Sequence, residues 1–173
     1  SGCQVRLEST STNTVPPKMF LCATTATGVY FSISDSNLTV VGRHTATIPY
    51  HPTIVWNTEN TGTSSTSNQR YTFRNTHLNV FGADATVYHQ ASLNVNNLAL
   101  DFDRVTFAVE STAADLGPQI AHFKTATQTD TSIRFANCNG VIRNDRTKQA
   151  ALVHGDSASL DQSAFTIINS TFD

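Results

Sequence analysis

Charge is scarce in this sequence. Asp, Glu, Lys and Arg make up 14% of the 173 residues and the net charge is −2, whereas an average domain carries about 25% charged residues. No basic cluster is present that would neutralise a phosphate backbone, so we expect no nucleic-acid partner. No apolar run is long enough to span a bilayer, and the first residues lack the charged and apolar regions of a signal peptide. We therefore expect no membrane-spanning segment.

Cysteine is also scarce, and the usual catalytic motifs are missing. The three cysteines stand at positions 3, 22 and 138, an odd number without metal-ligand spacing. We expect at least one free, buried thiol and no disulfide framework. The sequence contains no glycine-rich phosphate loop, no G-x-S-x-G, no H-E-x-x-H and no C-x-x-C. These absences exclude the standard nucleotide-binding, serine-esterase and zinc-protease motifs, and we expect no cofactor.

What the sequence does contain is a repeated pattern, clearest in residues 71–80 (YTFRNTHLNV). Apolar residues alternate with other residues, an Asn or Asp follows, and after two further residues the alternation resumes. Period two lines one face of a strand, and an amide or carboxylate can bond a turned backbone, so each copy predicts two strands joined by a bend. The copies are FSISDSNLTV, YTFRNTHLNV, IRFANCNGVI and FTIINSTF, with bends at Asp35, Asn75, Asn137 and Asn169, and a fifth copy with Phe102 at the bend.

A second and more regular repeat runs between these copies. Its members lie in short strand-like runs and are separated by 33, 33, 33 and 32 residues; they are Leu21, Ile54, Val87, Ile120 and Leu152. Two interleaved repeats with a common period predict a solenoid, in which each turn stacks only on its neighbours. The alternative is a β-sandwich, which also consists of short strands and polar turns, but a sandwich has no reason to keep a fixed recurrence.

The corner sequences resemble those of the right-handed parallel β-helix superfamily, which includes pectate-lyase-like proteins and bacteriophage tailspikes. The resemblance covers about residues 20–173 and implies three strands per turn and ladders of stacked amides at one bend, interrupted at Phe102. We predict an all-β, right-handed parallel β-helix of about four to five turns over residues 19–173, preceded by an N-terminal extension or incomplete first turn at 1–18. Because both ends look uncapped, we expect a fragment of a longer protein or a subunit that covers the ends.

The first candidate site consists of charged residues. In a solenoid, residues one period apart become neighbours at about 4.8 Å, and the expected register places Arg74 over Asp101, with Asp103 in the adjoining bend. An exposed ion pair of this kind is worth about 0–1 kcal/mol and needs no function. The functional alternative is a pair of catalytic carboxylates, as glycoside hydrolysis requires, with Asp101, Asp103 and Glu110 as candidates.

The second candidate site is a column two residues after the aliphatic repeat, made of Ala23, Trp56, His89, His122 and His154. If the aliphatic residues point inward, the column does too, and it is a stack of satisfied histidines. If the intervening residues point inward, the column is an exposed stripe. Trp56 could then stack on a sugar, with the three histidines and Arg74 as polar ligands. Imidazoles also bind metals, but no carboxylate that could orient a metal-binding imidazole is evident beside these positions, so we expect no metal.

The resemblance implies a function in carbohydrate recognition. We predict a tailspike-like, receptor-binding segment that recognises bacterial surface polysaccharide or another glycan, forms a homotrimer, and lies outside the cell or on a virion surface. A Thr-, Ser- and Asn-rich exterior with little charge suits a neutral glycan. Two alternatives stay open. One is a glycoside hydrolase or polysaccharide lyase of the same architecture, in which arginines at 74, 104, 134 or 143 would assist elimination; the other is a structural spacer or adhesin segment.

Overall fold

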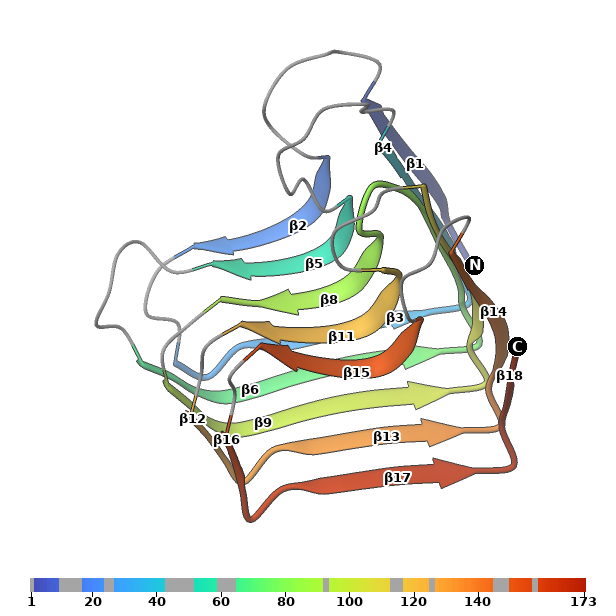
Figure 1. Cartoon of the computed structure of the whole chain (residues 1–173). Helices are drawn as coiled ribbons and strands as arrows, with labels where there is room; N and C mark the ends of the chain where they lie inside the picture. Colours follow the sequence, from blue (N-terminus) through green and yellow to red (C-terminus); the bar gives the residue numbers. More distant parts are fainter. Residues whose placement is uncertain are drawn as a thin grey trace.

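The computed structural model describes residues 2–9, 17–23, 27–42, 52–58, 65–91, 94–112, 117–124, 127–144, 150–156 and 159–173. Within these ranges all regular structure is β-strand (Figure 1), and the strands pair in parallel in all three sheets. The chain is an all-β parallel solenoid of about four turns with a period near 33. Parallel pairing excludes the alternative β-sandwich, whose sheets are antiparallel.

Three sheets, here called A, B and C, enclose a common interior (Figure 1). Sheet A contains β1 (Gln4–Ser9), β4 (Asn37–Gly42), β7 (His77–Gly82), β10 (Thr106–Ser111), β14 (Asn139–Asn144) and β18 (Thr171–Phe172). Sheet B contains β2 (Lys18–Ala23), β5 (Thr53–Thr58), β8 (Thr86–Gln90), β11 (Gln119–Lys124) and β15 (Ala151–Asp156). Sheet C contains β3 (Tyr30–Ser34), β6 (Ser65–Arg74), β9 (Asn94–Asp103), β12 (Thr127–Thr129), β13 (Ser132–Ala136), β16 (Ser159–Asp161) and β17 (Ala164–Ile168). From β3 onward the chain passes through C, A and B in turn.

The register of sheet B confirms the second sequence repeat in all but its first turn. The successive register partners in β5, β8, β11 and β15 are Trp56, His89, His122 and His154. The aliphatic residues two positions earlier therefore also lie one above another. In the first turn Leu21 pairs with Trp56 and not with Ile54. Leu21 thus stands where Ala23 is predicted, and the prediction for this turn is wrong by two residues.

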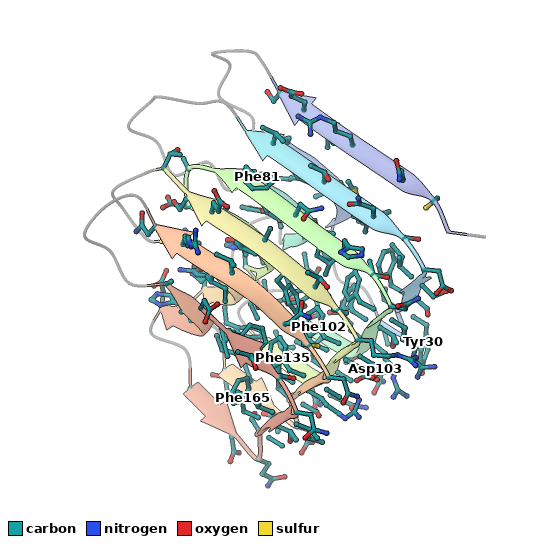
Figure 2. The ribbon with its side chains drawn as sticks, turned by 90° about the vertical axis from the view of Figure 1, so that its right-hand side faces the viewer. Tyr30, Phe81, Phe102, Asp103, Phe135 and Phe165 are labelled. Carbon is teal, nitrogen blue, oxygen red and sulfur yellow. The ribbon has the colours of Figure 1, made fainter. Side chains whose placement is uncertain are left out.

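The interior is filled by columns of aromatic rings. Phe102 lies between Phe73 and Phe135, with ring centroids 5.3 and 5.0 Å apart and planes 8° and 10° from parallel. All three rings are fully buried, and each removes about 150–250 Å² from water. Figure 2 shows Phe102 and Phe135 behind the strands of sheet A, inside the coil. At Gly140 a Cβ would lie 2.6 Å from both the Cβ and the carbonyl oxygen of Phe107, its register partner, so the absence of a side chain makes room for the Phe107 backbone and Cβ.

The bend between sheets C and A has a left-handed backbone in every turn. Its residues have φ between 46° and 54° and are Asp35, Asn75, Arg104, Asn137 and Asn169. Asn and Asp tolerate positive φ better than other side chains with a Cβ, which accounts for four of the five positions. Asn75 Nδ2 donates a hydrogen bond of 2.6 Å to Asp35 Oδ1. The predicted amide ladder is therefore present in part.

The prediction for the middle copy of the repeat is wrong by two residues. Arg104, and not Phe102, occupies the bend, while Phe102 belongs to the buried strand β9. Residues 98–107 offer alternating apolar side chains in either register. Burial of the Phe102 ring between two other phenylalanine rings favours the observed one, because it removes the largest apolar group from water.

A second series of left-handed bends lies within sheet C, and the sequence pattern does not reveal it. Its members have φ between 49° and 56° and are Asn68, Asn97, Asp130 and Gln162. Asn97 Nδ2 donates to Asn68 Oδ1 at 2.8 Å, so this series forms a short ladder too.

The first and last turns leave apolar side chains in solvent. Within the described ranges β1 pairs with β4 alone, at one edge of sheet A. Leu21 is 60% exposed in the first full turn, and Phe165 and Ile167 in the last turn are 51% and 46% exposed. Within the described ranges no element covers these three side chains.

Candidate functional site

The outward side of sheet C carries a strip of charged side chains, called here the charged face. Alternation along the strands buries Tyr71, Phe73, Leu100 and Phe102 and turns the intervening residues outward. The charged face consists of Arg70, Arg74, Asp101, Asp103 and Arg134, with Tyr30 beside Arg70 at one end. Tyr30 is 78% exposed, so the strip offers both an aromatic ring and charged groups to solvent.

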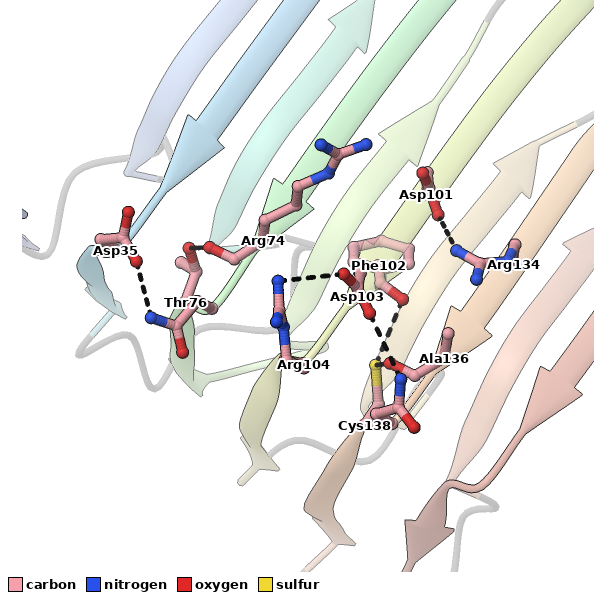
Figure 3. Close-up of polar contacts among 12 residues, drawn as sticks. Asp35, Arg74, Thr76, Asp101, Phe102, Asp103, Arg104, Arg134, Ala136 and Cys138 are labelled. Carbon is pink, nitrogen blue, oxygen red and sulfur yellow. Dashed lines mark hydrogen bonds and ion pairs between the residues drawn. The ribbon is translucent and has the colours of Figure 1, made fainter.

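Two ion pairs lie on or beside the charged face (Figure 3), and the one between Arg134 and Asp101 joins neighbouring turns. Arg134 Nη1 donates to Asp101 Oδ1 at 2.8 Å, and Arg104 Nη2 lies 3.4 Å from Asp103 Oδ2. The expected contact of Arg74 with Asp101 is wrong, because the register pairs Arg74 with Asp103 and Asp101 with Thr72. The two-residue shift of Phe102 into the core is the reason.

The three candidate carboxylates do not gather at one place. Asp101 and Asp103 lie two residues apart on the same face of β9, and both contact arginines. Glu110 lies on β10 in sheet A, where its register partners are Phe81 and Arg143. The structure therefore brings together two of the three groups, and places Glu110 on another side of the solenoid.

The tryptophan and the three histidines of sheet B form a continuous column. The Trp56 and His89 rings stack with centroids 3.9 Å apart and planes 18° from parallel. His89 Nδ1 lies 3.0 Å from His122 Nδ1, and the rings of His122 and His154 lie 5.4 Å apart. Four successive turns of the chain are thus joined through aromatic and imidazole contacts, as the shared register predicts.

This column points away from the interior, yet its centre is buried. Tyr88 packs on Tyr71 of sheet C, and Asn57 Nδ2 donates to Gln69 Oε1 of sheet C, so the residues between the column positions face inward. The column therefore faces outward. His89 and His122 are nevertheless only 2% and 1% exposed. Neither expected arrangement is complete: the column faces out, but it is not an exposed stripe.

Trp56 is half-buried and already has partners on both sides. Lys18 Nζ lies 3.9 Å from the centroid of the indole, and His89 stacks on the ring. Burial lowers the pKa of the Lys18 ammonium. With this cation–π contact and the His89 stack, the indole is held in place by the protein itself, which leaves less of its surface for a sugar.

Asp156 is a member of this site that the sequence analysis did not single out. Asp156 Oδ2 accepts from His122 Nε2 at 3.1 Å, and Asp156 Oδ1 accepts from His154 Nε2 at 2.8 Å. Burial raises the pKa of the Asp156 carboxyl, but the two histidine hydrogen bonds outweigh that effect and hold the pKa below its usual value. The prediction that no carboxylate lies beside the histidines is therefore wrong. The available signal is spacing, because Asp156 follows His154 by two residues on one face of β15.

Two of the histidines, His122 and His154, form with Asp156 a set of donor atoms that could hold a metal ion. The ligand atoms of His122, His154 and Asp156 all lie within 4.8 Å of one another. No other group of three such residues is found in the described part of the chain.

No family model matches the sequence, and no curated protein matches it. Among the described residues there is no helix of sufficient length and apolar character to cross a membrane.

Proposed function

We propose that this solenoid recognises bacterial surface polysaccharide through the charged face of sheet C, as a receptor-binding segment of the tailspike type. The proposal moves the glycan site away from the tryptophan and histidine column, because His89 and His122 are buried and Trp56 is packed between two partners. It includes a homotrimeric assembly and a place outside the cell or on a virion surface. Their support is the resemblance of the corner sequences to tailspikes.

The observation that carries the proposal is the pairing of Tyr30 with Arg70 on the open side of the sheet. Tyr30 and Arg70 are register partners, and both are exposed. An aromatic ring can cover the apolar face of a pyranose, and a guanidinium offers several donors to hydroxyl or carboxylate oxygens. The same surface continues along β6 to Arg74 and includes Asp101 and Arg134, which are register partners on neighbouring strands about 4.8 Å apart. This arrangement suits an extended chain of sugar units.

A glycan array of bacterial capsular and O-antigen polysaccharides tests the proposal directly. We expect micromolar or tighter binding to at least one glycan, and a loss of at least tenfold in affinity for Tyr30→Ala and for Arg70→Ala. Arg143→Ala is the matched control, because Arg143 is an exposed arginine on β14 of sheet A. An array without binders, or a loss caused equally by Arg143→Ala, would contradict the proposal.

The same samples separate recognition from the two alternatives. New reducing ends after incubation would favour a glycoside hydrolase that uses Asp101 and Asp103, and absorbance from unsaturated sugars would favour a lyase. Binding without either product supports recognition. The absence of both binding and product supports a spacer segment.

A further inference from the structure

We propose that His122, His154 and Asp156 form a binding site for a zinc-class divalent cation on the outward side of sheet B. This site is separate from the charged face and does not depend on the proposed function. Two imidazole nitrogens and one carboxylate oxygen are a donor set that zinc accepts, and three protein ligands leave a fourth position for water. Calcium and magnesium prefer oxygen ligands alone, so the two histidines disfavour them.

The distances are close to those that an ion would impose. Ligands at about 2.0–2.1 Å from zinc lie roughly 3.3 Å from one another in a tetrahedron. The observed separations are 3.1 Å for His122 Nε2 to Asp156 Oδ2 and 2.8 Å for His154 Nε2 to Asp156 Oδ1, and all three ligand atoms fall within 4.8 Å. The three groups therefore lie close enough together for one ion to contact all of them.

Burial and register fix two of the ligands and leave an entry path. His122 is 1% exposed and is held on β11, in register with His154 on β15. The side chains of His154 and Asp156 are 37% and 35% exposed, so an ion can enter from solvent on their side. The proposed site is thus buried on the side of His122 and open to solvent on the side of His154 and Asp156.

His89 contacts the ring nitrogen of His122 that points away from Asp156. Its Nδ1 lies 3.0 Å from His122 Nδ1, and a second ring nitrogen held in this way fixes the tautomer and the orientation of a metal-binding imidazole. Without an ion, the Asp156 carboxylate accepts, so His122 carries its proton on Nε2; a neutral His122 then accepts at Nδ1 from His89. With an ion on Nε2, His122 carries its proton on Nδ1 and donates to His89. Each neutral ring keeps one proton, which exchanges between its nitrogens through solvent or the shared hydrogen bond.

One nearby charge opposes a cation. Lys124 is the register partner of Asp156 and is exposed. Lys124→Ala should therefore bind zinc at least as tightly as the parent chain, whereas loss of a ligand should weaken binding. These opposite signs separate the proposed site from a general effect of altering this end of sheet B.

Calorimetric titration of the untagged chain with Zn²⁺, and with Co²⁺ followed by visible absorption, tests the proposal. We expect one site per chain and the absorption of four-coordinate cobalt. His154→Gln and Asp156→Asn should each weaken binding at least tenfold, and the double variant should abolish it. His77→Gln is the control, since His77 is exposed on sheet A. Stoichiometry below one, or equal loss with His77→Gln, would overturn the proposal.

Imidazole nitrogen NMR gives a readout that does not depend on affinity. Addition of Zn²⁺ should move the His122 proton from Nε2 to Nδ1, while the His77 spectrum stays unchanged. Unfolding curves without metal confirm that each variant is folded. An unchanged His122 tautomer at saturating zinc would also overturn the proposal.

Discussion

Arg104 occupies the place next to Asn75 in the bend between sheets C and A, and both have a left-handed backbone, with φ of 53° and 47°. The backbone amide of Asn75 donates to the carbonyl of Asp103 at 2.9 Å, so consecutive turns are bonded at this bend. An asparagine suits this conformation, and an arginine does not. The middle turn therefore carries local backbone strain at one exposed residue.

Replacement of Arg104 by asparagine should stabilise the solenoid. Positive φ costs an ordinary residue about 1–2 kcal/mol, and asparagine avoids part of that cost. The variant loses the exposed contact with Asp103, which is worth about 0–1 kcal/mol, so we expect a net gain of about 0.5–1 kcal/mol in urea unfolding. Arg74→Asn is the control, because Arg74 lies in a strand with extended backbone. A gain with Arg74→Asn as large as with Arg104→Asn would contradict the explanation.

Truncation of Phe102 should destabilise the protein strongly. Phe102→Ala removes the central ring of a three-ring column in which every member is fully buried. Loss of a buried phenylalanine costs about 3–5 kcal/mol, measurable as a shift in the urea midpoint. Phe165→Ala serves as the comparison, since that ring is 51% exposed and should cost less than about 1.5 kcal/mol. Similar costs at both positions would mean that Phe102 is not in the core.

Removal of the Asn75 amide should raise the pKa of Asp35. The hydrogen bond from Asn75 holds the Asp35 pKa below 3.8, while slight desolvation acts in the opposite direction. Asn75→Gly keeps the left-handed bend and removes the donor, so the pKa should rise toward 3.8 in a carboxyl NMR titration.

The sign of the linked stability follows from that shift. A lowered folded-state pKa stabilises the fold above pH 3.8, and the contribution disappears as pH falls through the folded-state pKa. The part of the destabilisation by Asn75→Gly that comes from the lost hydrogen bond to the Asp35 carboxylate should therefore be present above pH 3.8 and should disappear in strong acid. Asn97→Gly, at the other bend series, should leave the Asp35 titration unchanged; a shift there would contradict the assignment to Asn75.

The two described cysteines should differ sharply in reactivity. Burial raises the pKa of the Cys138 thiol, which donates weak hydrogen bonds to the carbonyls of Ala136 and Phe102 at 3.3 and 3.4 Å. Cys3 is exposed, and the thiolate is the reactive form. In a Cys22→Ser background, an aromatic disulfide reagent should titrate one thiol at once and the second only in denaturant. Rapid reaction of both thiols in the native protein would contradict the buried position of Cys138.

The residues of the candidate sites show where prediction from the sequence succeeds. The vertical contacts of Trp56, His89, His122 and His154 follow from a spacing of 33, 33 and 32 residues alone. Contacts between side chains of different columns cannot be predicted from this spacing. The contact of Asp156 with His122 is the example. Asp156 meets His122 because β15 places it two residues after His154 on the same face of the strand, beside the column, from where its carboxylate reaches diagonally to β11.

The sequence alone determined the parallel solenoid, its period and four of the five left-handed bends between sheets C and A, because these depend on alternation and on residue types that tolerate positive φ. Tertiary structure decided the register of the middle turn, because a slip of two residues keeps every side chain on the same face and only packing of Phe102 against neighbouring rings separates the two registers. It also decided that His89 and His122, two of the three outward histidines of sheet B, are buried. Period two shows which residues share a face of a strand, and it contains no information about what covers that face.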